Sequence, residues 1–482
     1  MAATPTAVAH AGASVPAPHA AMPWRTLWSG DALFSAVIAL VLPVALHMVG
    51  LSALNRLMYP ALAFVGAGIL YARGSPWYLG LCVWLFAASP LIRRLADFHL
   101  GFEPTSAVLL APYLACLWAA LSGVGYCLGP RPRFAGAFLV MLGCVLYGFV
   151  LSVFDGRATA AAVESVKWAV GPLVALHIIA NPGSRPAFRE AVVAAFVSAG
   201  FLMALYGAAQ FVNPAPWDVE WLNNMLRYSA AVGGSPEPFA IRVFSTMHSA
   251  GSAGAFLAAA MVFAIALPLA VALPCLLPIM LAIGLCQYRS IWAGTLVAIA
   301  CIAAIGPARE RTRIILCAIA VGLSLGSLSA VPEMEYTLGN RLRSLTELGA
   351  DESGEQRLQQ YARFLYDNEN LLFGMGLGTG GGSQIQEQSD GPGYIDGGLL
   401  VSFVALGVAA AGLFFAALAL TVCRACAATG RLPGEGYLYV AMLAGWVLQL
   451  PFGSVHIGEH GFPAWLAIGL SLSASAGRTR KG

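Results

Sequence analysis

Long runs of apolar residues occur throughout this chain, and they constrain its fold more than any other feature. Of the 482 residues, 59% are apolar or aromatic and only 10% are charged. A typical soluble domain has about 25% charged residues. We therefore expect an integral membrane protein. This excludes a soluble nucleotide-using enzyme, a nucleic-acid binder and a secreted disulfide scaffold as descriptions of the whole chain.

The apolar runs have the length of membrane-spanning helices. Such a helix needs about 20 mostly apolar residues. The sequence predicts an all-α polytopic bundle of about 14 transmembrane helices, with 12 as the lower bound. The predicted spans are 31–51, 56–72, 76–95, 105–128, 134–154, 163–181, 187–212, 248–267, 269–286, 290–306, 313–331, 395–423, 435–453 and 460–476.

Arginines in the short loops set the expected orientation, because such loops carry excess positive charge on the cytoplasmic side. With 14 spans, all the short-loop arginine groups fall on one side, together with both termini. On the opposite side lie 19 of the 23 acidic residues. The loop and tail arginines are Arg131, Arg133, Arg185, Arg189, Arg309, Arg311, Arg313, Arg424, Arg431, Arg478 and Arg480.

The predicted bundle has two parts, 31–331 and 395–476, joined by a long outer loop over 332–394. Within that loop, Gln356–Asn368 places its apolar residues on one helical face, and Ser353 with Gln356 forms a capping-box pattern. This predicts a short amphipathic helix on the outer membrane surface. The segments expected outside the bundle are a disordered tail over 1–30 and a basic tail over 477–482.

Several arginines lie near the outer ends of predicted spans. A charge is energetically costly there, so these arginines are candidates for a functional role. Arg289 stands in Gln-Tyr-Arg-Ser-Ile-Trp, and Arg242 stands in Ile-Arg-Val-Phe-Ser-Thr-Met-His. Each is either an interfacial arginine that snorkels to the headgroups or a guanidinium that binds a diphosphate. Their positions at successive outer ends favour diphosphate binding. His248 is either a base or an interfacial histidine.

The other polar groups have a structural and a chemical interpretation, and for some of them we favour the structural one. Asp396 at the entry of a span either caps that helix or deprotonates a hydroxyl. The glycine run over 374–382 either turns the chain or forms an anion-binding nest, and we favour the turn. The cluster around Arg93 is expected to be a solvated loop whose charges pair. His456, Glu459 and His460 do not match H-E-x-x-H, so no metal site is expected there.

Six short segments occur in a fixed order around the long outer loop, within about residues 236–415. They resemble segments of the O-antigen ligase and O-antigen polymerase (Wzy-like) superfamily of bacterial membrane glycosyltransferases. The N-terminal half of the chain resembles this superfamily only in that it consists of successive membrane spans. The six segments are 242–247, 287–294, 339–342, 351–357, 372–378 and 396–400.

The resemblance implies a metal-independent enzyme without a cofactor at the periplasmic face of the bacterial inner membrane. Ligases of this superfamily usually carry a histidine where this chain has Asp396. The Asp-Gly-Gly pattern is closer to the polymerases, which join undecaprenyl diphosphate-linked repeat units in O-antigen, lipopolysaccharide or exopolysaccharide biosynthesis. The implied site residues are Arg289 and Asp396 for catalysis, Arg242 and Arg289 for the diphosphate, and His248, Arg357, Arg341 and Arg93 as accessory groups.

The implied partners are an undecaprenyl diphosphate-linked oligosaccharide and membrane lipids, with a chain-length regulator and a flippase as further candidates. Two alternatives stay open. One is a ligase that transfers glycan to lipid A-core, and the other is a transporter or flippase of a lipid-linked or anionic substrate. Transporters usually carry charged residues in the middle of their spans. The spans of this chain are nearly free of charge, which favours an enzyme over a transporter. The exceptions, Glu164 and Lys167, are one turn apart and are expected to pair.

Overall fold

The computed structural model describes residues 26–130, 132–226, 234–334, 339, 359–362, 366, 372–379 and 397–476. Within these ranges the chain is helical, apart from loops and one isolated bridge between Gly234 and Ile241. Each predicted span overlaps at least one helix. The helices are α2 (Gly30–Ala36), η1 (Val37–Val41), α3 (Leu42–Met48), α4 (Ser52–Ala72), α5 (Trp77–Leu100), η2 (Ala107–Leu110), α6 (Ala111–Cys116), α7 (Ala119–Cys127), α8 (Ala135–Phe154), α9 (Ala158–Ala180), η3 (Pro182–Ser184), α10 (Arg185–Val212), α11 (Pro216–Leu226), α12 (Ala250–Ala264), α13 (Leu269–Leu285), α14 (Arg289–Ile305), α15 (Ala308–Ser329), α16 (Pro332–Met334), α19 (Gly398–Thr429), α20 (Gly436–Gln449) and α21 (Gly458–Ala476).

The lengths of the helices show how many of them can cross a membrane. Among the described residues, eight helical segments are long and apolar enough to cross a membrane, and η2–α6 with α7, bent by 41°, makes a ninth if it is one span. Others are shorter: α20 has 14 residues and so extends about 21 Å, less than the ~30 Å of a bilayer core. The all-α multi-pass membrane protein is confirmed, whereas the number of 14 crossings stays a prediction.

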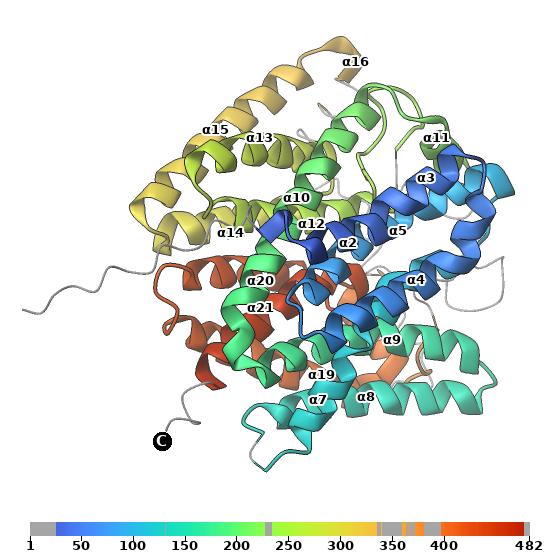
Figure 1. Cartoon of the computed structure of the whole chain (residues 1–482), viewed down its shortest axis with the longest axis vertical. Coiled ribbons are helices and arrows are strands. Elements are labelled where there is room, and N and C mark those ends of the chain that lie inside the picture. The colour runs from blue at the N-terminus through green and yellow to red at the C-terminus, as the bar shows by residue number, and fades with distance from the viewer. Residues whose placement is uncertain are drawn as a thin grey trace, which may run out of the picture.

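Helix α21 is largely buried and packs against α9, α10, α12, α19 and α20, and it lies next to α20 in Figure 1. Small residues let these helices approach closely. A Cβ on Gly171 would lie only 2.1 Å from Trp465, and one on Gly469 would lie 3.0 Å from the backbone of Ala175. The outer helices α2, α4, α8 and α15 instead expose apolar side chains, as expected where they face lipid.

The basic loops meet at the end of the bundle where α21 ends. Arg133 and Arg431 both donate to Ser475, at 2.9 and 2.5 Å. Arg185 and Arg189 both pair with Glu435. These contacts confirm that three of the predicted cytoplasmic loops share one end. Glu459, in the first turn of α21, therefore lies at the opposite end.

A break in α19 receives the glycine-rich segment. Gly407 has φ 72° and ψ 168° inside the helix, and Gly374, Gly376 and Gly378 have φ of 80°, 84° and 83°. The backbone N–H groups of residues 375–377 donate to the carbonyls of residues 404, 405 and 148, at 2.8 to 2.9 Å. The prediction of a turn is therefore correct for Gly374, Gly376 and Gly378, and residues 380–382 of the run lie outside the described residues. These three N–H groups are already bonded and form no anion-binding nest.

The predicted amphipathic helix is visible only in part. Residues 359–362 and Tyr366 are helical, and the remainder of 356–368 lies outside the described residues. Tyr361 packs against Leu400, Val401 and Val404 of α19. The described part of this helix therefore lies against the bundle, at the start of α19.

Candidate functional site

A carboxylate surrounded by donors lies at the end of the bundle opposite the basic loops, at the start of α21. Glu459 Oε2 accepts a hydrogen bond from the Tyr113 hydroxyl at 2.8 Å. Its Oε1 atom lies 3.2 Å from Nε2 of His248 and accepts from Ser252 Oγ, also at 3.2 Å. The His460 ring follows, with Nδ1 3.6 Å from Oε1. Hydrogen bonds to both oxygens favour the ionised carboxylate, and the helix N-terminus adds to this.

His248 lies beside this carboxylate and is more exposed than it. It precedes Ser249, whose hydroxyl caps α12 by accepting from the N–H of Ser252 at 3.1 Å. The His248 side chain is 33% exposed. Its Nδ1 atom, however, is buried and has no hydrogen-bond partner among the described residues. A buried ring nitrogen without a partner is uncommon in native structures and marks a place where a ligand group can bind.

A backbone hydrogen bond brings the Arg242 segment to the end of α13, shortly before Arg289. The N–H of Val243, which follows Arg242, donates to the carbonyl of Leu285 at 3.0 Å. Arg289 is the first residue of α14. Both arginines are half-buried. A Cβ on Gly251 would lie 3.5 Å from the His460 ring and 3.6 Å from that of Tyr288, so the segment before Arg289 reaches the Glu459 cluster.

A buried ion pair holds the loop that carries Arg242 and His248. Arg94 Nη1 lies 2.6 Å from Asp218 Oδ1, and both side chains are fully buried. Arg94 also donates to the carbonyl of Ser245 at 2.5 Å. Ser245 adopts a left-handed φ of 51°, and Gln210 Oε1 accepts from its N–H at 2.8 Å. This loop conformation is therefore imposed by buried polar contacts.

In the charged cluster between two predicted spans, Arg93, Arg94 and Asp97 are buried, which corrects the expected solvated loop for these three, whereas His99 is exposed and Glu103 is partly exposed. Arg93 donates to Asp97 at 3.3 Å and lies over the Trp221 ring, 4.7 Å from its centroid. Arg56 also pairs with Asp97, at 2.7 Å. The predicted pairing of these charges is correct, but their surroundings are not those of a solvated loop. The contacts of Arg93 are structural and do not join it to the Glu459 cluster.

Three predicted site residues, Asp396, Arg341 and Arg357, lie outside the described residues, and their roles stay predictions. The two glycines after Asp396 are described. A Cβ on Gly398 would lie 2.3 Å from the carbonyl of Gly453, and one on Gly397 would lie 2.9 Å from that of Pro451. The start of α19 therefore packs against the loop that leads into Glu459.

His456, in that same loop, is separate from the cluster. Its Nε2 lies 3.1 Å from Ser402 Oγ, and its ring meets the Trp168 ring edge-on at 4.9 Å. Burial lowers the pKa of His456 to about 3, so the ring is neutral at physiological pH. The expected pair of Lys167 with Glu164 is confirmed at 3.2 Å.

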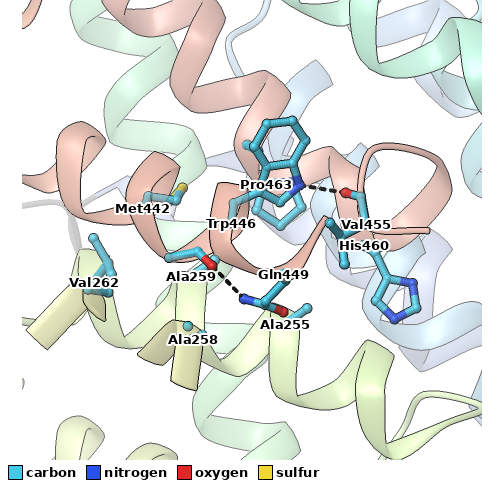
Figure 2. A pocket seen from close by; sticks show the side chains of 14 residues that line it. Ala255, Ala258, Ala259, Val262, Met442, Trp446, Gln449, Val455, His460 and Pro463 are labelled. Carbon is cyan, nitrogen blue, oxygen red and sulfur yellow. Dashed lines mark hydrogen bonds between the residues drawn. The ribbon is translucent and has the colours of Figure 1, made fainter. Parts of the chain in front are cut away.

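A small apolar cavity adjoins the cluster between α12, α14, α20 and α21. Figure 2 shows His460 at one end of its lining and Met442 with Val262 at the other. Its volume is about 40 Å³, room for only a few water molecules. A Cβ on Gly445 would lie 2.5 Å from the carbonyl of Gly294, so α14 and α20 close the cavity tightly. It is too small for a prenyl chain or a sugar.

Sequence comparisons assign the chain to no known group: no protein-family model matches it, and no curated protein is similar enough to count as a match. The chemistry of the site therefore rests on its own residues. They combine an ionised carboxylate, two imidazoles and two arginine-bearing segments at one end of a membrane bundle.

Proposed function

We propose that this protein is a membrane glycosyltransferase that polymerises lipid-linked repeat units. It transfers glycan from undecaprenyl diphosphate to a sugar hydroxyl, without a metal, at the periplasmic face of the bacterial inner membrane. Both termini are cytoplasmic in this proposal. The enzyme serves surface polysaccharide biosynthesis, such as O-antigen or exopolysaccharide.

The observation that carries the proposal is the hydrogen bond from Val243 to Leu285, which holds the segment of Arg242 against the end of α13, four residues before Arg289. Departure of a diphosphate develops negative charge, and arginine forks stabilise that charge. Each well-placed donor contributes about 3 kcal/mol in the transition state. Arg289 also begins a 17-residue helix, whose N-terminal dipole favours an anion.

The surroundings of the two segments suit a donor that is anchored in the membrane. The segments lie at the end of the bundle opposite the basic loops, where a diphosphate headgroup on a prenyl tail would be found. The carboxylate and imidazoles beside them offer proton-accepting groups for an acceptor hydroxyl.

The break in α19 is the feature that favours a transporter, since broken helices line transport sites. Here the backbone of residues 372–377 fills the break. A ligase that transfers to lipid A-core differs from the polymerase only in its acceptor, so the acceptor assay separates the two.

The test is reconstitution of the purified protein in liposomes with an undecaprenyl diphosphate-linked oligosaccharide. No nucleotide or metal is added, and the products are separated by size. A ladder at repeat-unit spacing is the expected result. Transfer only to added lipid A-core would identify a ligase. Movement of the substrate between leaflets without any transfer would identify a transporter and refute the proposal.

A further inference from the structure

The proposed transfer needs a base for the acceptor hydroxyl, and the Glu459 cluster contains a group suited to that role. We propose that His248 is the catalytic base, that Nδ1 is its reactive atom, and that Glu459 is the positioning residue that holds its ring. This inference rests on the proposed function and deepens it.

The geometry sets which nitrogen is reactive. Nε2 of His248 faces a carboxylate oxygen at 3.2 Å, so Nε2 carries the proton in the neutral ring. The lone pair is then on Nδ1, the buried atom that has no partner among the described residues. In catalytic histidines, a carboxylate typically accepts the proton of one ring nitrogen and so orients the ring. The lone pair of the other nitrogen then acts as the base.

The neighbouring groups are less suited to this role. Tyr113 is buried and its hydroxyl donates to Glu459. Both oxygens of Glu459 already have donors. The His460 ring lines the small apolar cavity, which cannot admit a sugar. His248 differs from these residues because it lies on the loop that also carries Arg242.

The step balances without a further reactant. The acceptor oxygen forms a bond to the anomeric carbon while the bond from that carbon to the diphosphate oxygen breaks. The leaving diphosphate takes the bonding electron pair. The hydroxyl proton passes to Nδ1 of His248, the resulting imidazolium is stabilised by Glu459, and the proton is then lost to water.

The first measurement compares initial rates of chain extension in liposomes for wild type, His248→Ala and His248→Gln. General-base catalysis contributes about 100- to 10,000-fold, and we expect a loss of that size in both variants. Donor binding at equilibrium should be unchanged, because the arginine-bearing segments are intact. Added imidazole should restore part of the rate in His248→Ala but not in His248→Gln, where the longer side chain fills the site.

The second measurement tests Glu459 through epistasis. Glu459→Gln should lower the rate strongly in the wild-type background and little in the His248→Ala background, because Glu459 acts through the ring. A purely structural role would lower the rate by the same factor in both backgrounds. His99→Ala, which removes a ring stacked on His47, is the control for loss of a histidine elsewhere.

The outcomes separate the inference from the proposed function. If wild type extends chains and His248→Ala does so at the same rate, the inference is wrong and the function stands. Loss of rate in His248→Ala with no imidazole rescue, together with equal effects of Glu459→Gln in both backgrounds, also overturns it. If the Asp396→Asn variant is inactive while the His248→Gln variant stays active, the base is Asp396 and the inference is wrong. Absence of transfer by the wild type would refute the function itself.

Discussion

Replacement of Asp218 by asparagine should destabilise the protein by about 3–5 kcal/mol, the usual cost of breaking a buried ion pair. Asp218 and Arg94 are 2.6 Å apart and both side chains are fully buried. Asparagine has nearly the same shape but no charge, so the guanidinium stays buried and uncompensated. Asp218 Oδ2 also accepts from Tyr206 and Gln210, both at 2.8 Å, and these bonds weaken when the acceptor loses its charge.

The chain offers a matched control for burial. Asp155 and Arg157 are 2.7 Å apart, but their side chains are 57% and 29% exposed. An exposed pair is worth less than about 1 kcal/mol. Asp155→Asn therefore changes the same chemical group at a similar distance, and the difference between the two variants reports burial together with the two extra hydrogen bonds of Asp218.

The assay is denaturant-induced unfolding in detergent micelles, followed by tryptophan fluorescence. The double replacement Arg94→Met with Asp218→Leu should be closer to wild type in stability than Asp218→Asn, because no unpaired charge remains. Equal losses for Asp218→Asn and Asp155→Asn, or a double variant that is less stable than Asp218→Asn, would refute this account of the pair.

Three further predictions test other parts of the molecule. Gly376→Ala should lower the thermal midpoint, since a left-handed residue costs about 1–2 kcal/mol and the Cβ would lie 2.1 Å from a serine hydroxyl, whereas Gly143→Ala, with open space around it, should not. Because the pKa of His456 falls from 6.5 to about 3 on folding, protonation favours the unfolded state. Stability should therefore drop as pH falls below 6.5, by about 2 kcal/mol at pH 5, and a His456→Gln variant measured by denaturant titration should lack this part of the pH dependence. Arg242→Ala and Arg289→Ala should each abolish the product ladder while the protein still elutes as a folded species in size-exclusion chromatography, and full polymer from both would remove diphosphate binding.

The sequence alone determined where the helices are and which loops lie together. Apolar runs must be helical in a bilayer because no water satisfies their backbone groups, and each predicted span overlaps a helix. Arginines from three of the short loops, Arg133, Arg185 with Arg189, and Arg431, meet as expected at Ser475 and Glu435. The glycines at 374–378 indicated a turn, because only glycine adopts a positive φ without strain.

Only the tertiary structure decided helix lengths and polar partners. Apolar composition continues past the end of a helix, so the predicted span 435–453 became the shorter α20, and the number of crossings did not follow from composition. Arg94 pairs with a residue 124 positions away, and Tyr113 reaches Glu459 across 346 positions. No local pattern marks such contacts. The spacing of Glu459 and its neighbouring histidines in the sequence matched no motif. The partner of Glu459 is His248, which lies just before α12, far from Glu459 in the sequence. These distant pairs form because a buried charge is stable only beside a partner, and packing of the helices decides which partner is within reach.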